Sequence, residues 1–143
     1  MDLELLSPLA GWCVPLGTVP DPVFADGTMG PGVAIDPTGD TLHAPCDAVV
    51  QTVHAARHAV ILRTESGVEL LMHIGIDTVG LHGEGFELLV AEGQTVAAGD
   101  PLIRFDLDRL VLAGCPVLTP VLVTDVSATA VPLAMGRLVA VGE

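Results

Sequence analysis

Hydrophobic residues occur along the chain in short runs that Pro and Gly interrupt at close intervals. Short runs rich in Val, Leu and Ile are typical of strands, because an amphipathic helix needs a longer repeat with a period of about 3.6 residues. We interpret as strands or extended segments residues 33–35, 42–45, 48–54, 58–64, 68–74, 86–91, 102–106, 117–124 and 137–141. Residues 107–113, which Gly114 and Pro116 follow, are the best candidate for a helix. The pattern predicts an all-β fold, an antiparallel β-sandwich or barrel with short helical turns, built as one domain over residues 1–143.

The two strongest strand candidates, 58–64 and 68–74, flank a turn sequence at 65–67 and predict a β-hairpin. A two-residue turn would pair His58 directly with His73 and hold their Cβ atoms ~5 Å apart on one face of the sheet. A three-residue turn would shift the register by one residue and leave the two side chains diagonal but still close. In either register the two imidazoles can reach one common atom, such as a phosphorus, a metal ion or a proton.

The neighbours of His73 favour chemistry rather than a structural role. Leu70, Leu71, Met72 and Ile74 surround it with apolar side chains. Such surroundings lower the pKa of an imidazole by desolvation and keep it neutral and nucleophilic. They also exclude water from a labile adduct.

The remaining histidines, His43, His54 and His82, are expected to be surface or edge residues without a role. His54 precedes His58 by four positions, a spacing that joins side chains on a helix. On a continuous strand the same spacing separates them by ~13 Å.

Composition narrows the class of partner. The net charge is −13, and the positive residues number five, all of them Arg. Nucleic acid and anionic lipid are bound through Lys and Arg, so a chain this acidic is expected to bind neither and to prefer a basic protein partner. The three cysteines form no CxxC pair and predict reduced thiols in the cytoplasm. The start of the chain has no basic region typical of a secretory signal, and no apolar run reaches the length of about 18 residues that a membrane span needs.

Several segments of the sequence resemble those of a known family. The run 67–77 (GVELLMHIGID) and its continuation to Phe86 are similar to the signature of glucose-type IIA domains of the sugar phosphotransferase system. Residues 21–25, 32–37 and 92–106 are similar to that family as well. The resemblance extends over nearly the whole chain.

The resemblance implies a phosphoryl carrier with an all-β sandwich fold. His73 would accept the phosphoryl group through Nε2 from the histidine of the carrier HPr and pass it to the cysteine of a IIB domain. His58 would hydrogen-bond the phosphoryl oxygens. No cofactor would be required, although zinc can lie between His58 and His73 with a carboxylate from a partner. The chain would be cytoplasmic and would meet the membrane only through the permease. The partner-docking face would include Asp21, Phe24, Met29, Ile61, Leu71 and Asp77.

The chain departs from the family pattern two residues before the first histidine, where the family usually has a hydroxyl side chain and this sequence has Ala56. The adjacent Arg57 is expected to compensate with its charge. The sugar is not fixed by the sequence, and glucose and N-acetylglucosamine are the leading expectations. The sequence also leaves open whether HPr, enzyme I or IIBC modules are fused to this domain.

Three other functions are alternatives to a phosphoryl carrier. A biotinyl or lipoyl carrier attaches its cofactor to Lys, and the chain has none. A zinc hydrolase using His58, His73 and Asp77 would need a further ligand and a general base, and no HxH or HExxH motif is present. A regulatory binding module is the third alternative. Phosphate labelling separates these, because a carrier becomes labelled on histidine.

Overall fold

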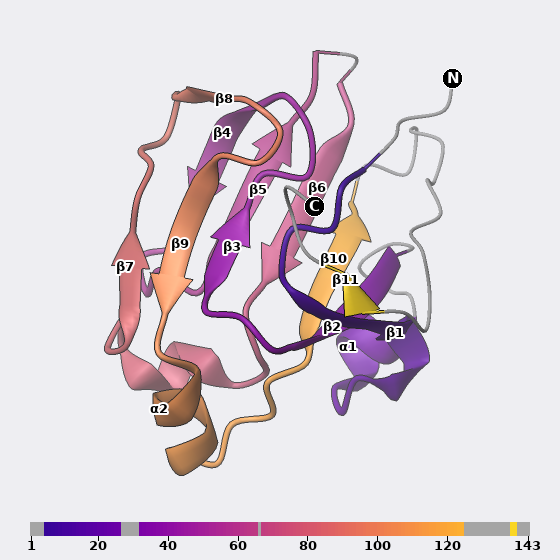
Figure 1. Cartoon of the computed structure of the whole chain (residues 1–143), viewed down its shortest axis with the longest axis vertical. Helices are drawn as coiled ribbons and strands as arrows, with labels where there is room; N and C mark the ends of the chain where they lie inside the picture. Colours follow the sequence, from indigo (N-terminus) through magenta and orange to yellow (C-terminus); the bar gives the residue numbers. More distant parts are fainter. Residues whose placement is uncertain (1–4, 27–31, 66, 125–137, 140–143) are drawn as a thin grey trace.

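The computed structural model describes residues 5–26, 32–65, 67–124 and 138–139, and these form two antiparallel sheets packed face to face (Figure 1). The larger sheet has the order β11-β1-β2-β10-β6-β5-β4-β8, and the smaller has the order β3-β9-β7. Figure 1 shows the smaller sheet in front of β4 and β5. The strands are β1 (Gly11–Pro15), β2 (Gly32–Pro37), β3 (Thr41–His43), β4 (Ala48–Val53), β5 (Ala59–Arg63), β6 (Glu69–His73), β7 (Phe86–Leu88), β8 (Thr95–Val96), β9 (Pro101–Phe105), β10 (Thr119–Val123) and β11 (Leu138–Val139).

The predicted all-β antiparallel sandwich is therefore confirmed, and among the described strands neither sheet closes into a barrel. The predicted strands lie within about two residues of those observed, although the extended segment expected at 86–91 ends as a strand at Leu88. Of the strand expected at 137–141 the structure describes 138–139, and the ambiguous segment 125–130 lies outside the described residues.

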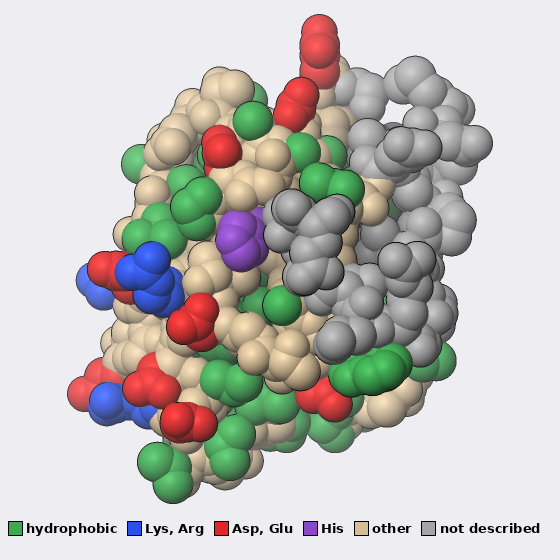
Figure 2. Space-filling view, viewed as in Figure 1, with side chains coloured by type: hydrophobic (Ala, Val, Ile, Leu, Met, Phe, Trp, Pro, Cys, Tyr) green, Lys and Arg blue, Asp and Glu red, His purple; other side chains and the backbone are tan. Residues whose placement is uncertain are grey.

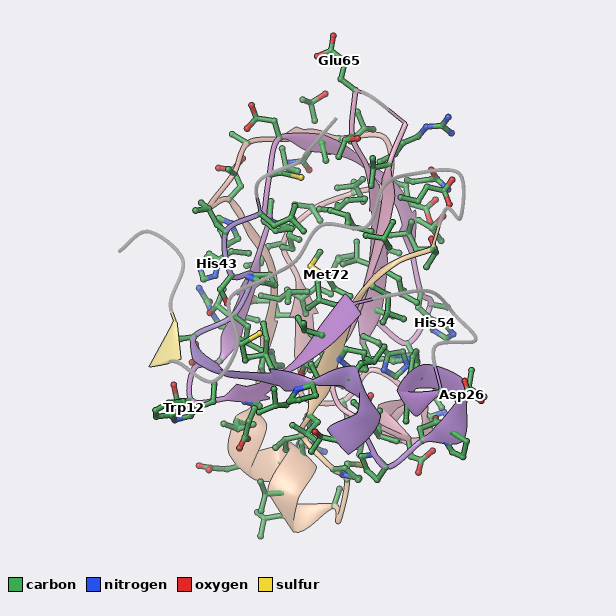
Figure 3. The ribbon with its side chains drawn as sticks, turned by 90° about the vertical axis from the view of Figure 1, so that its right-hand side faces the viewer. Trp12, Asp26, His43, His54, Glu65 and Met72 are labelled. Atoms are coloured by element: carbon green, nitrogen blue, oxygen red, sulfur yellow. The ribbon has the colours of Figure 1, made fainter. Side chains whose placement is uncertain are left out.

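The core lies between the sheets because alternate side chains of each strand point to opposite faces. On β5 and β6, the pairs Val60–Met72 and Leu62–Leu70 are at most 1% exposed and face this core. Met72 lies in the middle of the molecule in Figure 3. The alternate positions of these strands, which include His73, consequently lie on the outer face of the larger sheet.

The hairpin of β5 and β6 has a three-residue loop, which is the second of the two alternatives that the sequence allowed. Ala59, not His58, pairs with His73. The amide of Gly67 donates to the carbonyl of Thr64 at 2.9 Å, and Gly67 has a φ of +90°, which a side chain would disfavour. A turn followed by a left-handed residue is the usual three-residue hairpin loop. His58 consequently lies just before β5 rather than on it.

Short helices lie towards one end of the sandwich (Figure 1), and they are η1 (Leu16–Thr18), α1 (Pro22–Ala25), η2 (Thr78–Leu81) and α2 (Leu107–Leu112). The helix predicted at 107–113 is confirmed as α2, and Gly114 follows it in the left-handed conformation with a φ of +78°. Its first turn is capped by the side chain of Asp106. Helix α1 is capped by Asp21 and has Pro at its first position, where the missing amide proton costs nothing.

Candidate functional site: a histidine pair

His73 ends β6 and has one ring nitrogen already engaged. Its Nδ1 lies 2.7 Å from the carbonyl oxygen of Gly75, which can only accept, so Nδ1 carries the proton and donates. A neutral imidazole with the proton on Nδ1 presents an unprotonated lone pair at Nε2. The local backbone therefore selects the tautomer that is nucleophilic at Nε2.

The loop after His73 holds that carbonyl in place. Gly75 has a φ of +68°, and a Cβ there would lie 2.8 Å from Thr78 Cγ2 and 2.9 Å from the carbonyl oxygen of Pro116. The amide of Gly75 donates to the hydroxyl of Thr119 at 3.4 Å, and the hydroxyl of Thr78 donates to the carbonyl of Ile74 at 2.6 Å. The amide of Gly75 is thus engaged within the loop.

His58 lies in the turn between β4 and β5 and reaches the same place as His73. Its side chain is buried, with 2% of its surface exposed, and its ring centroid lies 4.6 Å from that of His73 at an interplanar angle of 82°. The ring of Phe86 lies on the core side, with a centroid distance of 6.4 Å. Within the part of the chain that the structure describes, Nδ1 of His58 is buried without a hydrogen-bond partner.

A third imidazole stands beside this pair. The rings of His54 and His58 have centroids 4.4 Å apart, so the expectation of ~13 Å along a continuous strand was wrong. The chain reverses between the two residues, with Arg57 in the left-handed conformation at a φ of +65°. His54 is exposed, and Figure 3 places it on the opposite side of the molecule from His43. No periodicity in the sequence signals this contact, because it depends on the shape of the turn.

Both histidines of the pair are harder to protonate than a histidine in water. The pKa of His58 is lowered to about 4, first by desolvation and then by the neighbouring His73 and His54. The pKa of His73 is also lowered, mainly by desolvation, while the bond to Gly75 and the carboxylate of Asp21 act in the opposite direction. Both rings are therefore neutral at pH 7, as the apolar sequence around His73 predicted.

A small apolar cluster covers the outer face of the larger sheet around His73. It contains Phe24, whose ring centroid lies 5.2 Å from that of His73, and Leu71, which is 8% exposed. Ile61 packs against this cluster and is half-buried. Three of the residues expected at the docking face, Phe24, Ile61 and Leu71, thus belong to or pack against this apolar cluster beside the imidazole of His73.

The polar residues expected at that face have different surroundings. Asp21 is half-buried and accepts from the amide of Val23 at 3.1 Å, so it caps α1. Its negative charge also acts to raise the pKa of His73. Asp77 is exposed and has a φ of +61°. Met29 lies outside the described residues. Sequence reasoning missed two apolar side chains, Val23 on α1 and Val79 on η2, which are 47% and 49% exposed.

The described residues do not meet the requirements of a metal site, a membrane-spanning helix or a disulfide. Among them, no group of three or more His, Cys, Asp or Glu side chains is arranged to hold a metal ion. No helix in this part of the chain is both long and apolar enough to cross a bilayer. The three cysteines, all within the described ranges, form no disulfide with one another.

Comparison with known proteins identifies the family of the chain. The family model for the phosphoenolpyruvate-dependent sugar phosphotransferase system, EIIA 1, matches residues 3–129. Glucose permease IIA from Mycoplasma capricolum has a similar structure, with a TM-score of 0.92 and 37% sequence identity, covering 100% of this chain and 93% of that one.

Curated relatives have two architectures. The glucose-specific EIIBCA component of the phosphotransferase system from Corynebacterium glutamicum is 56% identical over 123 residues, which are 86% of this chain but 18% of that protein. The glucose-specific EIIA component from Staphylococcus epidermidis is 43% identical over 124 residues, which are 87% of this chain and 75% of that protein. The chain thus spans less than a fifth of the fused relative and three quarters of the separate one. It belongs to the EIIA 1 family of the phosphoenolpyruvate-dependent sugar phosphotransferase system, a family of phosphoryl carriers.

Proposed function

We propose that His73 is the residue that carries the phosphoryl group and that His58 assists its transfer. The observation that carries this proposal is the hydrogen bond from His73 Nδ1 to Gly75, because it leaves Nε2 as the nucleophile beside the buried imidazole of His58. The lone pair of Nε2 forms a P–N bond while the P–N bond to the donor histidine breaks. In the second step a cysteine thiolate forms a P–S bond, and the electron pair of the His73 P–N bond returns to Nε2.

Phosphoryl transfer depends on in-line positioning and on stabilising charge at the phosphoryl oxygens. His58 is neutral at pH 7 and can donate one N–H to those oxygens. Arrival of the anionic group favours protonation of His58, which would make the contact charge-assisted. Arg57 supplies a positive charge next to His58 where Ala56 provides no hydroxyl.

The docking surface around His73 suits transient partners. Its apolar floor is formed by Phe24 and Leu71, and the exposed Val23 and Val79 extend it. The whole chain has a net charge of −13, and Figure 2 shows acidic side chains spread over the face on which the smaller sheet lies, with basic ones gathered at one edge. Charge complementarity speeds association, so a basic carrier such as HPr is the natural donor. A IIB domain is proposed as the acceptor. We propose the cytoplasm as the compartment in which the chain meets these partners.

The sugar served by the system is proposed from the curated relatives. Their names describe glucose-specific and mannose-specific EIIBCA components and a glucose-specific EIIA component. A glucose-type sugar is therefore the first substrate to test, with N-acetylglucosamine as the second. The carrier itself touches only the phosphoryl group, so the IIBC partner decides this specificity.

Zinc is proposed as an accessory and not as a requirement. A structural or catalytic zinc takes three or four protein ligands, and no three potential ligands in the described part of the chain are arranged to hold one, although His54 lies beside the pair. The residues do not complete a zinc site by themselves. His58 and His73 would hold the ion only together with a carboxylate supplied by a partner. The same shortage weighs against the alternative of a zinc hydrolase.

Labelling with phosphoenolpyruvate, enzyme I and HPr tests the proposal. The chain should acquire an acid-labile, alkali-stable label, and His73→Ala should acquire none. His58→Gln should accept the label but hand it to a IIB domain about 10²-fold more slowly, because the amide of Gln can donate a hydrogen bond but cannot become protonated beside the phosphoryl oxygens. The matched control is His82→Asn, an exposed position with a φ of +53° that Asn tolerates, and it should behave like the wild type. Normal labelling of His73→Ala would overturn the assignment, and a wild type that binds HPr without being labelled would indicate a regulatory module.

A further inference from the structure

The turn that carries His58 is built around His54. The carbonyl of His54 accepts from the amide of Arg57 at 2.8 Å, and its amide donates to the carbonyl of Ala59 at 3.0 Å. Its side chain takes part as well, because Nδ1 accepts from the amide of Ala56 at 3.0 Å. A side-chain acceptor two residues before an amide acts as Asn and Asp do in turns. The left-handed Arg57 is thus held within a closed set of hydrogen bonds.

The ring of His58 lacks the usual means of fixing its orientation. A functional histidine is commonly oriented by a hydrogen bond from its second ring nitrogen to a carboxylate or a carbonyl. His73 has such a bond to Gly75. Within the described residues, His58 Nδ1 has no partner, although it is buried. The orientation of the His58 ring must therefore come from packing.

Packing is supplied from both sides of the ring. His73 lies 4.6 Å from His58 between centroids, and His54 lies 4.4 Å from it, at an interplanar angle of 60°. Phe86 is more distant, at 6.4 Å. His73 is the group whose environment must change when it is phosphorylated, so it cannot be a constant support. His54 is the nearest ring that takes no direct part in the proposed transfer.

We propose that His54 is a positioning residue, whose ring holds the imidazole of His58 in the orientation needed to hand the phosphoryl group to the acceptor. The inference depends on the function proposed above for His58. It divides the two features of His54 into separate tasks. The ring positions His58, and the Nδ1 acceptor stabilises the turn.

Two substitutions separate these tasks. His54→Phe keeps a ring against His58 and removes the acceptor for the Ala56 amide, whereas His54→Asn keeps an acceptor for that amide and removes the ring. His54→Phe should therefore hand on the phosphoryl group nearly as fast as the wild type but unfold at a lower urea concentration. His54→Asn should keep its unfolding midpoint and transfer roughly ten- to a hundredfold more slowly, because small misplacements of a reacting group have costs of this size.

A double-mutant cycle shows whether His54 acts through His58. His54→Ala should slow transfer from the phosphorylated chain to a IIB domain by roughly tenfold or more in the wild-type background. In the His58→Gln background the same change should alter the rate less than about twofold, since the ring to be positioned is gone. A merely structural role of His54 would slow transfer equally in both backgrounds.

The control is His82→Asn, which should leave the transfer rate and the cycle unchanged. The inference is overturned if His54→Ala transfers at the wild-type rate, if its effect persists in the His58→Gln background, or if His54→Asn transfers normally. A wild-type chain that accepts no label from HPr would instead refute the proposed function. The two failures are therefore distinguishable in one set of assays.

Discussion

Gly75→Ala tests the loop that fixes the tautomer of His73. At a φ of +68° an alanine costs about 1–2 kcal/mol, because its Cβ approaches the following carbonyl. The new Cβ would also lie 2.8 Å from a methyl group of Thr78 and 2.9 Å from the carbonyl oxygen of Pro116, inside van der Waals contact. Such overpacking adds about 1–3 kcal/mol. The total expected loss of stability is about 2–5 kcal/mol.

Gly93→Ala is the matched control for this loss. Gly93 has a φ of +87° and no atom within 4 Å of the position of a new Cβ, so its substitution should cost only the conformational part. Urea unfolding measures the difference between the two variants, and about 2 kcal/mol corresponds to roughly 1 M in the midpoint. Equal midpoints for Gly75→Ala and Gly93→Ala would refute the clash.

The same pair of variants connects the loop to the chemistry. Displacement of Gly75 moves the carbonyl oxygen that accepts from His73 Nδ1 at 2.7 Å. Gly75→Ala should therefore slow phosphorylation under conditions in which it is folded, and Gly93→Ala should not. Wild-type labelling by folded Gly75→Ala would show that this hydrogen bond does not prepare the nucleophile.

Further predictions concern stability. The pKa of His58 is about 4 in the folded chain against 6.5 when unfolded, so the unfolded chain binds more protons between these values and stability is lost as the pH falls from 6.5 towards 4. The free energy of unfolding, measured by urea titration, should be about 1 kcal/mol lower at pH 5.5 than at pH 7.5. His58→Gln should not show this difference. Asp106→Ala removes the cap that accepts from the amide of Arg109 and should cost about 1 kcal/mol in urea unfolding. Leu62→Ala, at a fully buried position, should cost about 2–5 kcal/mol by the same measurement, and a loss below 1 kcal/mol would contradict its place in the core.

Nine of the eleven described strands were predictable because their apolar runs are short and clearly punctuated, whereas β1 and β8 were not among the predicted strands. The order of the strands in the sheets was not predictable. Neither the edges that the larger sheet leaves open among its described strands nor the pairing of β2 with β10 leaves a local signal in the sequence. Helix α1 could have been found from Asp21 and the following Pro, which together form a helix start signal.

The histidine pair was predictable in its proximity but not in its register. The sequence around 65–67 permits a two-residue or a three-residue loop, and the left-handed Gly67 decides for the longer one. The contact between His54 and His58 could not be predicted from their spacing, because it depends on how the chain turns between the two strands. The left-handed conformation of Arg57, a residue with a Cβ, has no signature in the residue type.

The central claim is that Nε2 of His73 is the phosphorylated atom. NMR of the chain labelled with ¹⁵N and phosphorylated by phospho-HPr can identify the bonded nitrogen through its coupling to ³¹P. The hydrogen bond from Nδ1 to Gly75 predicts that the coupled nitrogen is Nε2 of His73. Coupling to Nδ1 of His73, or to either nitrogen of His58, would contradict the account.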